Sequence, residues 1–187
     1  ELIDLYPDVL YESPERESPS WSLDRGIIVK REGNPKEATV EAWGVVDSQP
    51  TSKHFDRLVF DDLVTIDGVN TPDSIKKVSD RWSLALNLGS EGGKKRYAGT
   101  IYAFNDTYRE MRQRKAAVER LHPATEDGTA TGIPVMMAKS ELAERRRAQG
   151  PYVFSSQMLL DPKAEETQAF SQDWLRFYSK DLGDGRA

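Results

Sequence analysis

The run from Arg57 to Asp62 constrains the fold of this chain more than any other stretch. Three apolar residues follow Arg57 and lead directly into two adjacent carboxylates, Asp61 and Asp62. An apolar run without alternation predicts a strand buried on both faces, as in a parallel sheet flanked by helices. Acids at the carboxyl end of such a strand lie where open α/β folds bind ligands. An ordinary strand end before a turn explains the same pair equally well on sequence chemistry alone.

The acid pair also has a specific chemical interpretation. Asp61 can hold Mg²⁺ through oxygen, and Asp62 can orient a water for attack on a phosphate. This arrangement is typical of a Walker B element in a nucleoside triphosphatase. His54, shortly before the strand, is either a residue that supports the acids or, more simply, a surface histidine.

Length and composition limit what can surround this strand. The chain has 187 residues, enough for one domain with a core or for a domain and a small appendage. It has no cysteine, which excludes disulfides and thiolate metal sites and suits a reducing cytoplasm. Two histidines are too few for a typical zinc site, and a net charge of −5 argues against a surface that coats nucleic acid throughout. No apolar run could cross a bilayer and no signal-peptide pattern is found, so we expect a cytoplasmic protein that is not secreted.

The remaining pattern alternates strands with helices, which favours an α/β sheet. Thr71 as N-cap and Pro72 in the first helical position predict a helix that runs to about Leu88 and ends at Gly89. The residues 26–29 and 39–46 are expected to form a hairpin. Further strands are predicted at 97–102 and 116–121, an exposed loop at 12–20, and helices at 1–6, 107–115, 140–147 and 151–160, with another apolar segment at 170–178. We expect the four tryptophans to be core or half-buried packing residues.

A second candidate pair, Gly99 and Thr100, lies within the predicted strand at 97–102. Gly99 allows close approach of backbones, and the Thr100 hydroxyl can sense a phosphate. A phosphate cradle of the G-x-x-x-x-G-K-[ST] type is not found. The run from Gly89 to Lys95 is one residue too short, lacks the Ser or Thr, and lies between a helix and a strand. With a first residue that is not Met and a helical start, this predicts a fragment whose cradle lies upstream of Glu1.

Basic residues gather after the predicted strand at 97–102. They could meet DNA phosphates or supply charge to a nucleotide, but such a run is more often a solvated face. The same salt-laced surface is expected for the three consecutive arginines at 145–147. The basic residues of the first group are Arg109, Arg112, Arg114, Lys115 and Arg120.

Three blocks of this sequence together resemble the large subunit of tailed-phage terminases, a DNA-packaging motor with an N-terminal ATPase and a C-terminal RNase H-like nuclease. The blocks occur in the family's order and the resemblance covers roughly residues 21–178. Departures are Ile101 and Ala103, where the family often has Arg and His, Asp62 in place of a commoner Glu, and Ser52 in place of a frequent Gly. The blocks are His54-Phe55-Asp56 with Leu58-Val59-Phe60-Asp61-Asp62, Gly99-Thr100 with Tyr102 and Phe104-Asn105-Asp106-Thr107-Tyr108, and Gly150-Pro151-Tyr152 with Phe154, Gln157 and Asp161-Pro162.

The resemblance implies a partial P-loop NTPase-type (ASCE) parallel sheet with flanking helices and a small C-terminal lid-like subdomain. Residues 1–138 would be the later part of the ATPase core, and residues 139–187 the lid-like subdomain next to a missing nuclease. Asp61 would be the Walker B acid that holds Mg²⁺, and Asp62 would orient the attacking water. Gly99 and Thr100 would form the ATP-binding coupling motif that links hydrolysis to DNA movement, with Thr100 sensing the γ-phosphate.

The resemblance further implies ATP and Mg²⁺ as cofactors and double-stranded DNA, the portal protein and the small terminase subunit as partners. A homo-oligomeric ring in the host cytoplasm would follow. The isolated chain would be a poor ATPase because it lacks the cradle. Two alternatives stay open: a non-catalytic α/β module that binds DNA or protein, in which the acid pair is structural, and a fragment of another P-loop motor such as a helicase.

Overall fold

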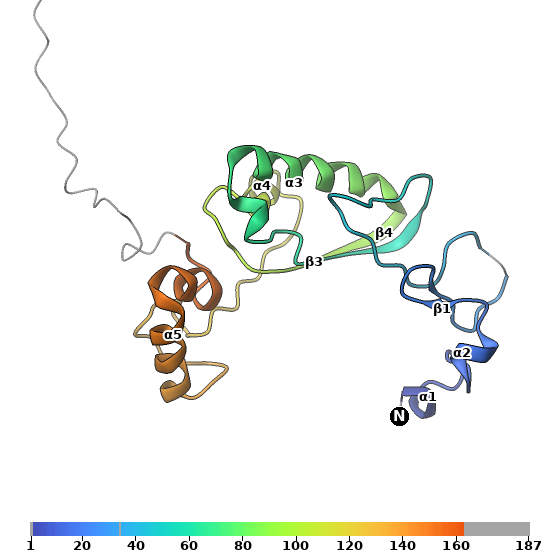
Figure 1. Cartoon of the computed structure of the whole chain (residues 1–187), viewed down its shortest axis with the longest axis horizontal. Helices are drawn as coiled ribbons and strands as arrows, with labels where there is room; N and C mark the ends of the chain where they lie inside the picture. The colour runs from blue at the N-terminus through green and yellow to red at the C-terminus, as the bar shows by residue number, and fades with distance from the viewer. Residues whose placement is uncertain (1, 34, 163–187) are drawn as a thin grey trace, which may run out of the picture. The chain divides into compact units, whose positions relative to one another are not determined.

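The computed structural model of the chain is mixed α/β, with a small parallel sheet and helices, and it describes residues 2–33 and 35–162 (Figure 1). The chain divides into two compact units, Glu1–Gly99 and Thr100–Ala187. The domain boundary expected at 138/139 stays a prediction. The elements are α1 (Leu2–Leu5), α2 (Pro14–Glu17), β1 (Trp21–Ser22), β2 (Gly26–Ile27), β3 (Phe55–Asp61), η1 (Asp67–Val69), α3 (Pro72–Ala85), η2 (Leu86–Leu88), β4 (Gly89–Ala98), α4 (Thr107–Gln113) and α5 (Lys139–Met158).

The strand predicted before the acid pair is confirmed as β3, and it pairs in parallel with β4. The register runs without interruption from Arg57 beside Lys94 to Asp61 beside Ala98. The strand predicted at 97–102 was placed too late in the chain. The structure has β4 there instead, which begins at Gly89 and ends at Ala98. The glycine-rich run that imitates a phosphate loop is therefore strand. It contains an irregularity in which a Cβ on Gly93 would lie 3.1 Å from the Asp56 carbonyl oxygen.

Helix α3 covers one face of this sheet, as Figure 1 shows. Its start is as predicted, because the Thr71 side chain accepts a hydrogen bond from the Ser74 N–H at 3.1 Å. Val78 and Trp82 form its buried stripe, and Trp82 is only 1% exposed. The expectation of a strand buried on both faces is wrong, since Val59 in the middle of β3 is 62% exposed. Phe60, on the next position, is buried and its ring stacks on Tyr97 at 5.1 Å between ring centres.

The hairpin expected between residues 26–29 and 39–46 is also wrong. Strand β2 pairs instead with β1, and the only ladder contact between the two predicted arms is an isolated bridge from Ile27 to Val40. Gly26 has a φ of 91°, and a Cβ there would lie 2.7 Å from the Ala38 Cβ, so residue 26 has to be glycine where these two segments meet. The predicted loop at 12–20 contains the short helix α2.

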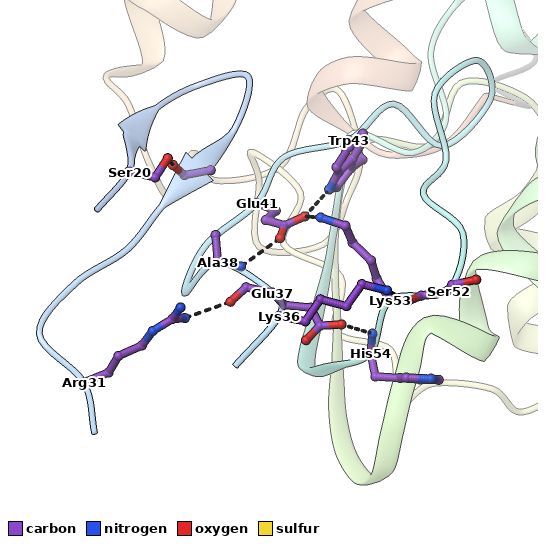
Figure 2. A network of polar contacts seen from close by, with 11 residues as sticks. Ser20, Arg31, Lys36, Glu37, Ala38, Glu41, Trp43, Ser52, Lys53 and His54 are labelled. Atoms are coloured by element: carbon purple, nitrogen blue, oxygen red, sulfur yellow. Dashed lines mark hydrogen bonds and ion pairs between the residues drawn. The ribbon is translucent and has the colours of Figure 1, made fainter. Parts of the chain in front are cut away.

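A network of polar side chains holds residues 36–43 against the segment that leads into β3 (Figure 2). Glu41 is its centre: its carboxylate accepts hydrogen bonds from the Ala38 N–H and the Trp43 indole, both at 2.9 Å, and from the Lys53 ammonium at 2.5 Å. The Lys53 ammonium also lies 5.0 Å from the centre of the Trp43 ring. The network fixes the entry into β3.

The second unit is built around α4 and α5. The Asp106 side chain caps α4 by accepting from the Arg109 N–H at 3.1 Å. Gly150, with φ 75°, breaks α5 before Pro151, as the sequence predicts. The strand predicted at 116–121 is wrong: those residues are exposed and irregular. The apolar segment predicted at 170–178 lies outside the described residues. The core of this unit consists of Ala124, Leu142, Phe154 and Leu159.

Of the tryptophans, only Trp82 meets the expectation of a core residue in full. Trp21, in the short strand β1, is 39% exposed, and Trp43, in an irregular segment, is 43% exposed. Trp174 lies outside the described residues.

Candidate functional site

The acid pair lies where β3 ends. Asp61 is the last residue of the strand, and the Asp62 N–H still donates to the Ala98 carbonyl oxygen at 3.1 Å. Asp62 itself has a φ of 43°, in the left-handed region that Asp tolerates better than most residues. Consecutive strand side chains point to opposite faces. The left-handed turn breaks that alternation, and both residues line the same cavity.

This cavity has a volume of about 480 Å³ and lies between the end of β3, the start of α3 and the turn at residues 44–47. Two further carboxylates, Asp47 and Asp67, line it together with the acid pair. In the described part of the chain, the single cationic side chain on its wall is Lys77. Carboxylate oxygens are the donor type that binds hard divalent cations such as Mg²⁺, so these acidic residues supply ligands of the type such an ion prefers.

Gly99 and Thr100 follow β4 directly. Ala98, the last residue of β4, is the partner of Asp61 in the parallel register. Gly99 is therefore the first residue after the end of the strand next to β3. Gly99 closes the first unit and Thr100 opens the second. Neither residue lines the acid cavity. The sheet edge therefore brings Asp61 and Asp62 together, and chain connectivity alone links them to Thr100.

The other candidate residues lie apart from this cavity. His54 precedes the first residue of β3, at the end of the strand away from the acids, and its N–H donates to Glu37 at 3.3 Å. It is exposed, which agrees with a surface histidine.

The basic residues of α4 are largely engaged within their own unit. Arg112 pairs with Glu119 at 3.4 Å and Arg114 pairs with Glu110. The Arg109 guanidinium lies 3.6 Å from the centre of the Phe104 ring. This is the salt-laced surface expected from the sequence, and an equivalent pair joins Arg145 to Glu141 at 2.9 Å in α5.

Sequence reasoning missed three residues that line the cavity. Asp67 was visible only as part of a turn before Gly68, and Asp47 as part of a polar loop. Lys77 carried a usable signal, because it stands three residues after Ser74 in the predicted helix and helical periodicity places both on one face. A cluster of three or more His, Cys, Asp or Glu side chains arranged to hold a metal ion is not found in the described ranges 2–33 and 35–162.

Two carboxyl groups outside the cavity have displaced pKa values. Burial raises the pKa of Asp106 above its ordinary value, against the opposing effect of the Arg109 N–H. Burial would also raise the pKa of Glu41, but the hydrogen bonds from Lys53, Ala38 and Trp43 outweigh it and hold this pKa below its ordinary value. Both groups stabilise local structure, and neither lines the acid cavity.

Fold and site together define a mixed α/β protein with an acid pair at the carboxyl edge of a parallel sheet. No known family model matches this chain, and no curated protein matches it. None of the helices in the described residues has the length and apolarity that a membrane crossing requires.

Proposed function

We propose that this chain contributes the metal- and water-handling part of an ATP-hydrolysing motor, in a protein of the terminase large subunit type. The observation that carries the proposal is the shared cavity of Asp61 and Asp62 at the end of β3, beside the strand that leads into Gly99 and Thr100. Asp61 holds Mg²⁺, and Asp62, on the turn, orients the attacking water. The resemblance assigns to Thr100, after the neighbouring strand, the sensing of the terminal phosphate.

The proposal includes a P-loop NTPase-type fold for the parent protein. A parallel strand pair with a helix on one face is compatible with a P-loop NTPase-type (ASCE) sheet, in which further strands lie beside β3 and β4. In that case the exposed Val59 side chain is covered in the parent protein by a further layer. The parent would carry the phosphate cradle and the nuclease, act on double-stranded DNA in the host cytoplasm as a ring on the portal protein, and cooperate with the small terminase subunit.

The test is Mg²⁺-dependent ATP hydrolysis by the full-length gene product that contains this chain. Asp61→Asn and Asp62→Asn are the variants of choice because Asn keeps the shape of Asp and also tolerates the left-handed backbone of residue 62. Asp67→Asn is the matched control, since it removes one charge from the same cavity without changing the acid pair.

We expect each acid-pair variant to lower kcat by at least about 100-fold, in the range of lost general-base or metal-ligand contributions, while ATP binding persists. Asp67→Asn is expected to stay within a few-fold of the wild type. Equal hydrolysis by all four proteins would make the acid pair structural. The absence of hydrolysis in the wild type would favour the non-catalytic binding module. A helicase-type motor would require the same acids but would unwind DNA rather than translocate it into a procapsid.

A further inference from the structure

We propose that Lys77 recognises the terminal phosphate of a nucleoside triphosphate in the acid cavity, and that Asp47 is its resting partner. The inference rests on the proposed function, because it names a phosphate contact for the same site. Lys77 lies in the second turn of α3. It lines the cavity together with two other residues of this helix, Ser74 and Val78. Burial of Val78 and Trp82 fixes this helix against the sheet.

A triphosphate in this cavity needs a positively charged side chain that can reach its phosphates. Four carboxylates and one ammonium line it, so a triphosphate that enters meets a strongly negative wall. A bound Mg²⁺ offsets part of this repulsion, but a magnesium-bound triphosphate is still an anion. Lys77 is the cavity-lining group that can meet its outermost phosphate, and a lysine ammonium on a flexible four-carbon stem can move to do so.

The present partner of Lys77 holds it only weakly. Its ammonium lies 3.7 Å from an Asp47 carboxylate oxygen, which is longer than a hydrogen bond, and the two side chains are 58% and 88% exposed. Exposed pairs of this kind contribute little to stability, so transfer of the ammonium from Asp47 to a phosphate costs little.

Asp47 is held at the rim of the cavity by its own backbone turn. The Ser48 N–H donates to the Gly44 carbonyl oxygen at 3.2 Å, and the Ser48 hydroxyl accepts from the Gly44 N–H at 3.0 Å. The turn at 44–48 therefore places Asp47 beside Lys77 without any contribution from a ligand. The pair is a built-in resting position for the ammonium.

The adjacent lysine supplies a matched control. Lys76 lies on the same helix with its ammonium 2.5 Å from Asp80, four residues on, and it does not line the cavity. Lys76→Ala and Lys77→Ala thus remove the same charge and the same stem from neighbouring positions, and only the second change reaches the cavity.

The experiment measures equilibrium binding of a magnesium-bound, non-hydrolysable ATP analogue and of MgADP to the full-length gene product. We expect Lys77→Ala to weaken binding of the triphosphate about tenfold, equivalent to about 1.4 kcal/mol, and to leave MgADP binding within about twofold. Lys77→Arg should restore most of the affinity. Asp47→Asn should bind the triphosphate at least as tightly as the wild type, because it releases the lysine and removes a negative charge; a merely structural ion pair would instead lose affinity on either change.

Three results would overturn the inference. If Lys77→Ala behaves like Lys76→Ala while Asp61→Asn abolishes hydrolysis, Lys77 makes no phosphate contact and the proposed function stands. If Lys77→Ala weakens triphosphate and diphosphate equally, the terminal phosphate is not what it recognises. If the wild-type protein binds neither nucleotide, the inference and the proposed function fail together.

Discussion

Replacement of Glu41 by Gln tests whether the network in Figure 2 fixes the entry into β3. The Glu41 side chain is only 4% exposed, and it accepts three hydrogen bonds, one of them from the Lys53 ammonium. Hydrogen bonds to charged groups contribute roughly 1.5–3 kcal/mol each, and Gln keeps one acceptor oxygen of the same shape. We therefore expect Glu41→Gln to lower the free energy of unfolding by about 2 kcal/mol.

The assay is urea unfolding of the chain followed by tryptophan fluorescence. Trp43 reports directly, because its indole is part of the network. For a unit of this size, about 2 kcal/mol corresponds to a fall in Tm of roughly 8–16 °C. Glu37→Gln is the matched control: the side chain of this half-buried neighbour accepts from the His54 N–H at 3.3 Å, and a Gln oxygen can still accept that bond, so the free energy of unfolding should change by less than about 0.5 kcal/mol.

The pH dependence supplies an independent check. Because the native pKa of Glu41 lies below its ordinary value, its carboxylate stabilises the fold above the ordinary pKa, and this contribution disappears as the pH falls through the lower native value. Glu41→Gln should lack this part of the acid destabilisation. A variant that matches Glu37→Gln in stability and retains the wild-type acid profile would refute the role assigned to the network.

Two further predictions concern helix caps. Thr71→Ala removes the acceptor for the Ser74 N–H and should destabilise the first unit by about 1 kcal/mol in urea unfolding, whereas Thr71→Ser should be close to neutral; equal stability of all three proteins would contradict the cap. Asp106→Asn keeps the cap of α4 but removes a carboxyl whose native pKa is raised by burial. In the wild type, the stabilising contribution of that carboxyl is complete below its ordinary pKa and is lost as the pH rises through the raised native value. The unfolding free energy of the Asn variant, measured by circular dichroism from acid to neutral pH, should lack this decline, and a retained decline would assign it to another group.

Local signals in the sequence were sufficient for α3 and for the break in α5. Thr71 and Pro72 define a helix start through backbone hydrogen bonding, and Gly150 followed by Pro151 defines a break through allowed dihedral angles. Both depend on residues next to each other in the chain. The strand before Asp61 was likewise predicted from its apolar run, and Asp61 and Asp62 do share one cavity.

Two of the failed predictions depend on side-chain packing and hydrogen bonding that the apolar pattern does not encode. The apolar Val59 was expected to be buried, but α3 covers one face of the sheet in the described residues and leaves this side chain exposed. The arm at 39–46 has strand-like composition, yet the bonds of Glu41 to Ala38, Trp43 and Lys53 hold it in an irregular path. The pairing of Lys77 with Asp47 needed the fold itself, because nothing in the intervening residues predicts that the turn meets the helix.

The backbone at Asp62 explains why two adjacent acids can act on one ligand. A left-handed residue other than glycine costs roughly 1–2 kcal/mol, so an exposed strand end would avoid it unless something compensated. The next two residues do so: Leu63 and Val64 are buried, and burial of such side chains stabilises by about 1.5–3 kcal/mol each. The chain therefore has to turn immediately after Asp61 in order to bury Leu63 and Val64, and that turn brings the Asp62 carboxylate into the cavity of Asp61. The shared cavity of the two acids is thus a consequence of the apolar pair that follows them, and a substitution at Val64 should disturb the acid pair without touching either carboxylate.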